Sequence, residues 1–476
     1  MNTMSAPQRR IQLAMAAMAA LALLALSGCA TLASDSGFGP VAQLTSDRLG
    51  KALQWARSDA DQDAINTRVA QLLAQPLSAD DAVQVALLNN KGLQASFSAL
   101  GIADADRVMA GRLPNPGFSI GRLQQGAGLE IDRSLQFNLT RLLLLPMVNR
   151  VEAQRFEQAR GAVALSVLSL ASQTRKAYTL ALAAEETRRY MLQVQDAAQA
   201  GAELARRQAQ VGNWSKLQQA REQGFYADAA LNLARADQQR SATREQLTRL
   251  LGLWGQQTQF QLPQRLPDLP KTPNDLPDIE QTAMAQRLDV QAAKLGTAQL
   301  ANNLGLTRAT RFINLLELGV VRNTYSDAPP QRGYSLSVEL PLFDWGDAHV
   351  AKAEAIYMQA VQQAADTAIN ARSEVRAAYA NYRSSHDIAR HFLDEIVPLK
   401  KRISDENQLR YNGMLIGVFE LLADARSQIT SVNGYIEALR DFWLAQADLD
   451  MALIGPTRIN LTPAALSTSD TGAAAH

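Results

Sequence analysis

Two stretches of the chain, about 200 residues apart, repeat one pattern of apolar and polar positions. Each begins with alternating apolar and polar residues, at Leu135–Thr140 and Leu336–Pro341, which predicts a strand with one apolar face. Each continues into a long helical pattern, over 148–211 and 348–412. At 1.5 Å per residue such helices are roughly 90–95 Å long, more than a globular core can use. The repeat predicts a mainly α fold with a small β part, built twice from a helix, a β-hairpin and a long helix.

The boundaries of these segments follow from capping residues, glycines and prolines. In chain order we expect a signal peptide, 1–28; a tether and belt segment, 29–76; a first unit, 77–255, with hairpin 117–143, long helix 148–211 and return helix 215–251; a Pro-rich linker, 256–277; a second unit, 278–456, with hairpin 312–342, long helix 348–412 and return helix 416–453; and a flexible tail, 457–476. The opening helix should begin at Ser78, capped with Asp81, and end near Leu113. Pro398 should kink the second long helix near Val397, because it removes one backbone hydrogen bond.

The first long helix carries a 3-4 spacing of apolar and small residues from Val163 to Ala209. This spacing, sustained over about six heptads, predicts close helix packing as in a coiled coil. An ordinary α-helical bundle would show the same periodicity, and only the length of the helix argues against it.

The N-terminus has the pattern of a bacterial export signal. Arg9 and Arg10 precede an apolar run, Ile11–Leu26, which is too short and Ala-rich for a membrane span. The following Leu26-Ser27-Gly28-Cys29 resembles the lipobox of bacterial lipoproteins, so Cys29 is the candidate lipidation site. An ordinary signal peptide with a chance cysteine is the alternative. Cys29 is the sole cysteine, which excludes disulfides and cysteine-rich metal sites, and Ala30 in place of Asp favours sorting to the outer membrane.

Charge and motifs exclude other classes. Lys plus Arg is 47 and Asp plus Glu is 46, which gives no indication of a nucleic-acid partner. His391 and Glu395 stand four residues apart on a helix and could share a metal, but a solvated pair is the favoured interpretation. Phosphate-binding loops and Ser-His-Asp spacings are absent from the sequence. We therefore expect neither an enzyme nor a cofactor or metal site.

The four predicted strands cannot close a barrel within one chain. In hydrocarbon, each unpaired backbone group at an open edge would cost several kcal/mol. Three chains would give about twelve strands, whereas two would give about eight, whose interior is filled by side chains. If the strands enter a membrane, a trimer is therefore expected.

Several short motifs occur in the order known from one protein family. They are Asp80-Asp81-Ala82-Val83-Gln84-Val85-Ala86-Leu87-Leu88-Asn89-Asn90, Leu113-Pro114-Asn115-Pro116, Val211-Gly212, Leu250-Leu251-Gly252-Leu253, Tyr411-Asn412-Gly413 and Leu453-Ile454-Gly455. In their order and spacing, the chain resembles the TolC-type outer-membrane efflux proteins over about residues 77–456.

The resemblance implies a homotrimer with a transmembrane β-barrel of twelve strands, four from each chain, and a trimeric α-helical barrel in the periplasm. The linkers would form a belt around the helices. Such a trimer is a passive outer-membrane conduit, anchored in outer-membrane lipid, that receives its substrate from a periplasmic adaptor protein and an inner-membrane transporter. A structural or secretion-associated coiled-coil lipoprotein without a pore is the alternative.

Three sets of residues are candidates for function. The first set lies at the two helix-hairpin tips and consists of Val211, Gly212, Asn213, Trp214, Gly413, Met414 and Leu415. Exposed apolar residues at a tip suggest a docking surface, and residues that serve only the turn are the alternative. Asn213 departs from the leucine that the family often has there. Glu420 and Asp424 share a helix face and would form carboxylate rings at a pore constriction, unless they are a solvated face.

The third set is aromatic. Phe118, Phe137, Tyr325 and Tyr334 lie on the apolar faces of the predicted strands and are candidates for an interfacial girdle. A soluble sheet packed on its own core is the alternative, and alternation by itself does not decide which face meets lipid.

Overall fold

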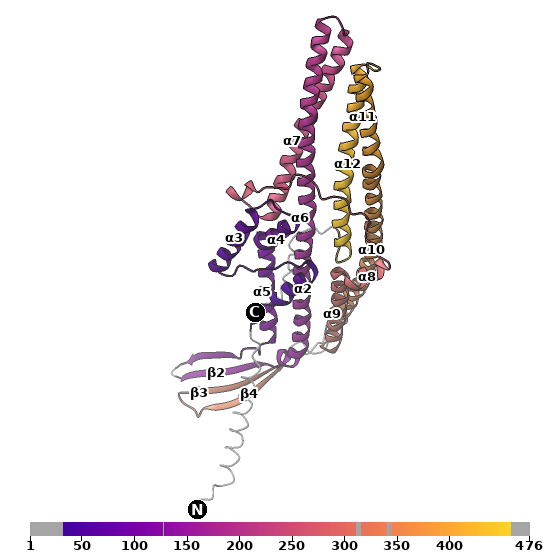
Figure 1. Ribbon diagram of the computed structural model, residues 1–476. Helices are drawn as coiled ribbons and strands as arrows, with labels where there is room; N and C mark the ends of the chain where they lie inside the picture. The colour runs from indigo at the N-terminus through magenta and orange to yellow at the C-terminus, as the bar shows by residue number, and fades with distance from the viewer. Residues whose placement is uncertain (1–31, 127, 311–315, 340–342, 344, 458–476) are drawn as a thin grey trace, which may run out of the picture. The chain divides into compact units, whose positions relative to one another are not determined.

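Residues 32–457, apart from 127, 311–315, 340–342 and 344, are described by a computed structural model of the chain. Cys29, the predicted signal peptide and the tail beyond 457 lie outside the described residues, as do parts of the second hairpin, 312–315 and 340–342. The described part is mainly helical with one four-stranded sheet, which confirms the predicted fold class at the level of one chain (Figure 1).

The elements in chain order are α2 (Phe38–Leu49), α3 (Asp59–Leu73), α4 (Ala79–Asn89), α5 (Lys91–Gly111), β1 (Gly117–Gln125), β2 (Gly128–Asn138), α6 (Leu139–Gln210), α7 (Lys216–Leu251), the 3-10 helix η1 (Gly255–Gln259), α8 (Ile279–Gln286), α9 (Leu288–Thr310), β3 (Leu316–Tyr325), β4 (Gln331–Val338), α10 (Asp347–His391), the π-helical turn η2 (Phe392–Ile396), α11 (Val397–Asn412) and α12 (Val418–Ala452). None of the described helices is long and apolar enough to cross a membrane.

The chain divides into two compact units. Of the described residues, the first unit comprises those within 32–41, 97–162 and 292–365, and contains the sheet, most of α5 and α9, and the starts of α6 and α10. The second comprises those within 42–96, 163–291 and 366–457, and contains the helix pairs α6/α7 and α11/α12 together with α3, α4 and α8.

The sheet joins the hairpins of the two repeats. Its strand order is β1-β2-β3-β4, and every neighbouring pair is antiparallel. β2 of the first hairpin pairs with β3 of the second, so that Phe137 lies opposite Leu318. Within the described residues, β1 and β4 are edge strands, each with one row of backbone groups that no strand pairs.

The first hairpin ends earlier than the sequence predicted. β2 stops at Asn138, and α6 begins at Leu139 instead of 148. The Asn138 side chain accepts a hydrogen bond of 2.8 Å from the backbone N–H of Arg141, which caps the new helix. The hydroxyl of Thr140 accepts a bond of 2.6 Å from the N–H of Leu316, so the first helical turn is also tied to β3. Pro146 consequently lies inside α6.

The opening helix is divided at Asn90. Ser78 caps α4 as predicted, accepting a bond of 3.1 Å from the N–H of Asp81, but α4 ends at Asn89 and α5 begins at Lys91. The break lets two side-chain amides reach the end of α7. Asn89 donates to the carbonyl oxygen of Gly252 at 2.7 Å, and Asn90 donates to that of Leu250 at 2.9 Å. Two motifs that carry the family resemblance therefore bind each other.

The second repeat has an equivalent contact made by different chemistry. Arg287, which is almost completely buried, donates to the carbonyl oxygen of Ala452 at the end of α12 at 3.1 Å. It also contacts Asp289 and Glu374 at 2.7 and 2.9 Å. Burial opposes the charge, but the hydrogen bonds to the two carboxylates outweigh it and raise the pKa of Arg287. In both repeats the opening helix is thus fixed to the end of the return helix.

The second long helix contains the expected irregularity, in the form of a π-helical turn. Phe392–Ile396 form this turn, and the N–H of Val397 bonds the carbonyl oxygen of Phe392, five residues back. Pro398 follows within the first turn of α11. Because proline has no N–H and its ring crowds the preceding turn, the extra residue of the π turn accommodates it.

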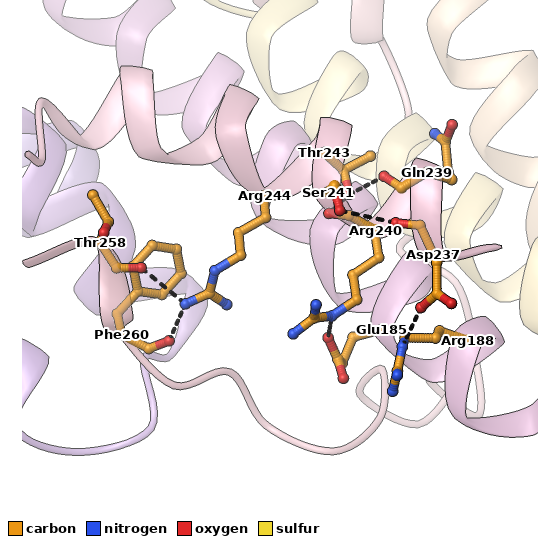
Figure 2. Close-up of polar contacts among 10 residues, drawn as sticks. All are labelled: Glu185, Arg188, Asp237, Gln239, Arg240, Ser241, Thr243, Arg244, Thr258 and Phe260. Carbon is orange, nitrogen blue, oxygen red and sulfur yellow. Dashed lines mark hydrogen bonds and ion pairs between the residues drawn. The ribbon is translucent and has the colours of Figure 1, made fainter. Parts of the chain in front are cut away.

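The α6 seam predicted from spacing is largely buried. Val163, Val167, Leu170 and Thr174 are buried, and alanines continue the row toward Ala205. Cross-helix ion pairs align α6 with α7, as Figure 2 shows: Arg240 contacts Glu185, and Arg188 contacts Asp237, both at 2.5 Å.

The Pro-rich linker lies on helices of both repeats. Arg244 of α7 donates to the carbonyl oxygens of Thr258 and Phe260, at 3.0 and 2.5 Å (Figure 2). Further on, His386 bonds the carbonyl oxygen of Pro270 at 3.0 Å, and the Trp443 indole N–H donates to that of Pro267 at 3.1 Å. These side chains satisfy carbonyl groups of a segment in which prolines prevent regular secondary structure.

Replacement of Gly252 by alanine should destabilise the second unit. Gly252 has a left-handed φ of +66°, and an added Cβ would lie 2.8 Å from the carbonyl oxygen of Asn89. We expect a loss of about 1–3 kcal/mol in the free energy of unfolding, measured by denaturant titration of helical circular dichroism.

Gly224→Ala is the matched control. Gly224 lies inside α7, and nothing comes within 4 Å of a Cβ added there. This variant should be neutral or more stable by about 0.5–1 kcal/mol. Equal stability of the Gly252→Ala variant and the wild type would contradict the role assigned to the α7 cap.

Candidate functional site

The strand register sorts the side chains of the sheet onto two chemically different faces. Residues directly opposite each other in paired strands point to the same face, and the face alternates along each strand. One face, called the apolar face below, carries most of the apolar side chains of all four strands, and each strand also places one arginine on it. Its apolar members are Phe118, Ile120, Leu129, Ile131, Leu135, Phe137, Leu316, Leu318, Val320, Tyr334, Leu336 and Val338.

The other face is polar and rich in small residues. Three acidic side chains, Glu130, Asp132 and Glu317, lie on it, together with serines, glycines and amides. The hydroxyls of Ser119 and Ser134 lie 2.7 Å apart. Nothing in the described part of the single chain covers the apolar face, where Phe118 and Tyr334 have exposed fractions of 66% and 84%, whereas a sheet packed on a soluble core buries its apolar side chains.

Three of the four candidate girdle residues share the apolar face. Phe118 and Tyr334 lie in one row that crosses the sheet through Leu135 and Val320. Phe137 lies one row nearer to the helices, opposite Leu318. Tyr325 is on the polar face, opposite Glu130, so the expectation that it joins the other three is wrong. The sequence could not reveal this, because alternation within a strand does not relate one strand to the next.

The first helix-hairpin tip is built around Gly212, whose φ is +81°. The N–H of Asn213 bonds the carbonyl oxygen of Gln208 at 2.9 Å, and the Asn213 amide also reaches the Gln208 side chain at 2.9 Å. Ser215 then caps α7 through a capping box with Gln218. The exposed asparagine thus has a local structural role. Val211 is exposed, whereas Trp214 is half-buried.

The second tip differs from the expectation. Gly413 has a φ of −81°, which any residue can adopt, and Met414 is the left-handed residue, with a φ of +56°. The N–H of Leu415 closes the turn onto the carbonyl oxygen of Arg410 at 2.9 Å. Met414 and Leu415 have exposed fractions of 93% and 78%. A methionine held in a strained conformation with its side chain in solvent suggests a contact that the single chain does not make.

The two candidate constriction residues lie on α12 just after this tip. Glu420 is exposed and Asp424 is half-buried. Two residues further on, Arg426 contacts Glu222 of α7 at 2.7 Å, and its guanidinium lies 4.3 Å from the ring centroid of Phe225. Glu222 is almost fully buried, with an exposed fraction of 1%. This ion pair joins the first helix hairpin to the second.

Sequence reasoning missed Glu222, although a signal exists. Buried residues of α7 recur every seven positions, at Glu222, Ala229, Ala236 and Thr243. Glu222 is the one charged member of this row. A charge at a seam position is expensive unless it is paired, so it indicates a specific partner on a neighbouring helix.

In the described part of the chain, no group of three or more His, Cys, Asp or Glu side chains is placed to hold a metal ion. His391 and Glu395 form an exposed pair at 3.3 Å. Near the first tip, hydrogen bonds from Arg206 and Arg207 lower the pKa of Glu203 to about 2, so this carboxylate stays charged at physiological pH.

Glu222→Gln should loosen the contact between α7 and α12. The amide keeps the shape of the side chain but leaves Arg426 without a counter-charge at a nearly buried position. We expect a loss of about 1–2 kcal/mol, seen as faster amide hydrogen exchange in both helices around the pair.

Glu406→Gln serves as the control, because the Arg410–Glu406 pair is exposed at both ends. Its effect should stay within about 0.5 kcal/mol. Unchanged exchange in the Glu222→Gln variant would show that the buried pair does not hold the helices together.

Comparisons with known proteins address the fold. No protein-family model matches the chain, and no curated protein matches it in sequence. Several solved structures match the chain in fold. The chain is similar to CusC, with a TM-score of 0.64 and 18% identity over 82% of this chain and 92% of that one. It is similar to the CmeC outer membrane channel of Campylobacter jejuni, with a TM-score of 0.66 and 17% identity over 85% and 91%. For the outer membrane protein VceC of Vibrio cholerae the TM-score is 0.66, with 14% identity over 80% and 97%. At such identities the likeness is one of fold, and at that level the resemblance to TolC-type outer-membrane proteins is confirmed.

Proposed function

We propose that three copies of this chain form an outer-membrane channel that conducts substrates passively out of the periplasm. The observation that carries the proposal is the sheet, which has an open apolar face, a polar face and two unpaired edges. Water can satisfy such edges, but hydrocarbon cannot, so a sheet that meets lipid with its apolar face must be closed by other chains.

The topology allows closure by identical copies. β1 and β4 run in opposite directions, since three antiparallel pairings separate them. β1 of one copy can therefore pair with β4 of the next in antiparallel fashion, and repetition of this head-to-tail contact makes a ring. Three chains with four strands each make twelve strands, and the polar face then lines the lumen. Two copies would leave a lumen filled by side chains.

The helices also present surface that suits further copies. Several apolar side chains on α10 and α11 are exposed in the single chain, including Met358, Ile369, Ile388 and Leu399. Scattered exposed residues need no explanation, but a succession of them along the same long helical segment favours packing against neighbouring chains. An α-helical barrel in the periplasm, with the Pro-rich linker as a belt, accounts for them.

The remaining parts of the conduit follow from the tips. The exposed Val211, Met414 and Leu415 would dock a periplasmic adaptor protein, itself bound to an inner-membrane transporter that supplies the energy. Glu420 and Asp424 would form carboxylate rings near this end and favour cations. Acylation of Cys29 would tether the chain to the membrane. No catalytic step is required of this chain.

The central experiment determines assembly and conduction together. Native mass spectrometry of the purified chain in detergent should give a trimer, and the same sample should open stable pores in planar bilayers. A monomer that forms no pore would refute the proposal.

Leu336→Arg tests which face meets lipid. Leu336 is on the apolar face, and an arginine there should cost about 2–4 kcal/mol per chain near the bilayer midplane. Heat-resistant trimer in membranes should decrease strongly. The matched variant Ser337→Arg places the same side chain on the polar face, beside Glu317, and should insert normally. The reverse order of the two variants would show that the faces are assigned wrongly.

Leu415→Asp tests the docking role of the second tip. In cells whose resistance to a toxic compound depends on this chain, the variant should lose most of that resistance while the trimer persists, because a charge replaces an exposed apolar contact. Asn213→Asp adds the same charge at the other tip, at a polar position where the Asn213 amide donates to the Gln208 side chain. The aspartate can instead accept from the Gln208 amide group once that amide turns over, so this variant should keep most of the resistance. Full resistance with Leu415→Asp would exclude this residue from docking.

A further inference from the structure

The charged residues of the sheet are separated by face more completely than the apolar ones, of which Leu123 and Val321 lie on the polar face. The strands contain four arginines, Arg122, Arg133, Arg322 and Arg332, one in each strand. All four lie on the apolar face, and the three acidic residues of the strands all lie on the other. Chance alternation would mix them. The arginines therefore do not have the sheet's own carboxylates as partners.

Three of these arginines form a continuous row. Arg133 lies directly opposite Arg322, and Arg322 lies directly opposite Arg332. Ile120 completes this row on β1, and Arg122 follows one row further toward the hairpin loops, diagonal to Arg133. Like charges directly opposite each other on neighbouring strands destabilise a sheet. The one hydrogen bond from the row within the described residues joins Arg133 to the Thr324 hydroxyl at 3.3 Å, which neutralises nothing.

The position of the row relative to the apolar rows indicates what covers it. The row with Phe118, Leu135, Val320 and Tyr334 is its immediate neighbour on the helix side, and Phe137, Leu318 and Leu336 form the next. On the loop side, the face carries the polar Gln124 and Thr324 together with Ile131 and Leu129 of β2. Arginine on a lipid-facing strand costs several kcal/mol at the midplane and almost nothing at the interface. The arginine row thus lies where the uninterrupted apolar rows end, which in the proposed channel is the level expected for lipid headgroups.

Resting on the proposed membrane channel, we propose that Arg133, Arg322 and Arg332, with Arg122, bind the phosphate groups of lipid headgroups in the leaflet around the hairpin loops. One amphiphile satisfies both halves of the surface: its acyl chains lie along the apolar rows, and its phosphates lie between adjacent guanidinium groups. Guanidinium forms paired hydrogen bonds with phosphate, and a bound phosphate removes the repulsion within the row. A lipid that carries two phosphates on a sugar headgroup suits a row of three charges better than a zwitterionic phospholipid.

The test uses the full chain in detergent and native mass spectrometry with defined lipids. The probes are lipid A, which is a bis-phosphorylated diglucosamine lipid, and its dephosphorylated form. Wild-type trimer should bind the phosphorylated probe at least about tenfold more tightly, with an affinity that decreases as salt is raised. Equal binding of the two probes would overturn the inference. Effective competition by millimolar inorganic phosphate would also overturn it, because the site would then take free phosphate and not a lipid.

Variants locate the site. Arg322→Gln combined with Arg332→Gln should weaken binding of lipid A about tenfold and leave binding of the dephosphorylated probe unchanged. Arg322→Lys with Arg332→Lys retains the charge without the planar fork and should recover part of the affinity. Lys401→Gln with Arg402→Gln removes the same charge from exposed positions of α11 and should have no effect.

The outcome separates this inference from the proposed function. If the wild-type chain forms no trimer and no pore, the channel proposal itself fails. If trimer and pore are present in the glutamine variant and lipid A still binds as in the wild type, the channel stands and the phosphate site is refuted. If the glutamine variant fails to assemble, the affinity of the lysine variant for lipid A is compared with that of the wild type at high and low salt. A lower, salt-sensitive affinity supports the phosphate site, and an affinity equal to that of the wild type refutes it.

Discussion

The pairing of every backbone N–H and C=O group is the constraint on which the rest of this structure depends. Four strands leave β1 and β4 each with an edge that no other strand of the described chain pairs. In water this would be an ordinary edge; beside lipid it would be prohibitive. The exposed apolar face favours lipid in the proposed channel, because a sheet in water would turn that face inward. Oligomerisation in the proposed channel is therefore a consequence of hydrogen bonding, and the even number of strands per chain lets identical copies close the ring without a parallel pair.

Much of the architecture could be predicted from periodicity and from turn chemistry. The return helices were placed within two residues, because Gly252 and the capping box of Ser215 with Gln218 are local signals. The errors occurred where a local signal was overruled by a distant partner. Strand-like alternation continues through Thr140, yet the chain turns helical at Leu139, since Asn138 caps the helix and Thr140 bonds Leu316, which is remote in sequence. The break at Asn90 likewise depends on carbonyl groups at the end of α7.

For the candidate sites too, local signals could be interpreted from the sequence, whereas relations between distant segments could not. The tips were found, because a glycine between two helical patterns is a strong signal, but the strained residue of the second tip is Met414 and not Gly413. The faces of the sheet could not be assigned, because alternation gives the two faces of one strand and only the register relates them across strands. That relation removed Tyr325 from the aromatic set and brought Arg133, Arg322 and Arg332 into one row. Neither result is accessible from one strand considered alone.

The apolar side chains of α6 are exposed near its start and buried further along, which suits two different surroundings for one helix. Near its start, Leu142, Leu143 and Met147 are exposed, with Leu143 at 63%. Further along, Leu168 and Leu182 are buried with exposed fractions of 1% and 0%. If the start of α6 were in water, these three exposed apolar side chains would be unfavourable. As a continuation of the apolar rows of the sheet it is expected, since the described rows alone extend over less than the roughly 25 Å of an outer-membrane apolar band. In the proposed channel, the early helix start would end the sheet while the apolar surface continues, and α6 would bury its apolar residues only beyond the lipid.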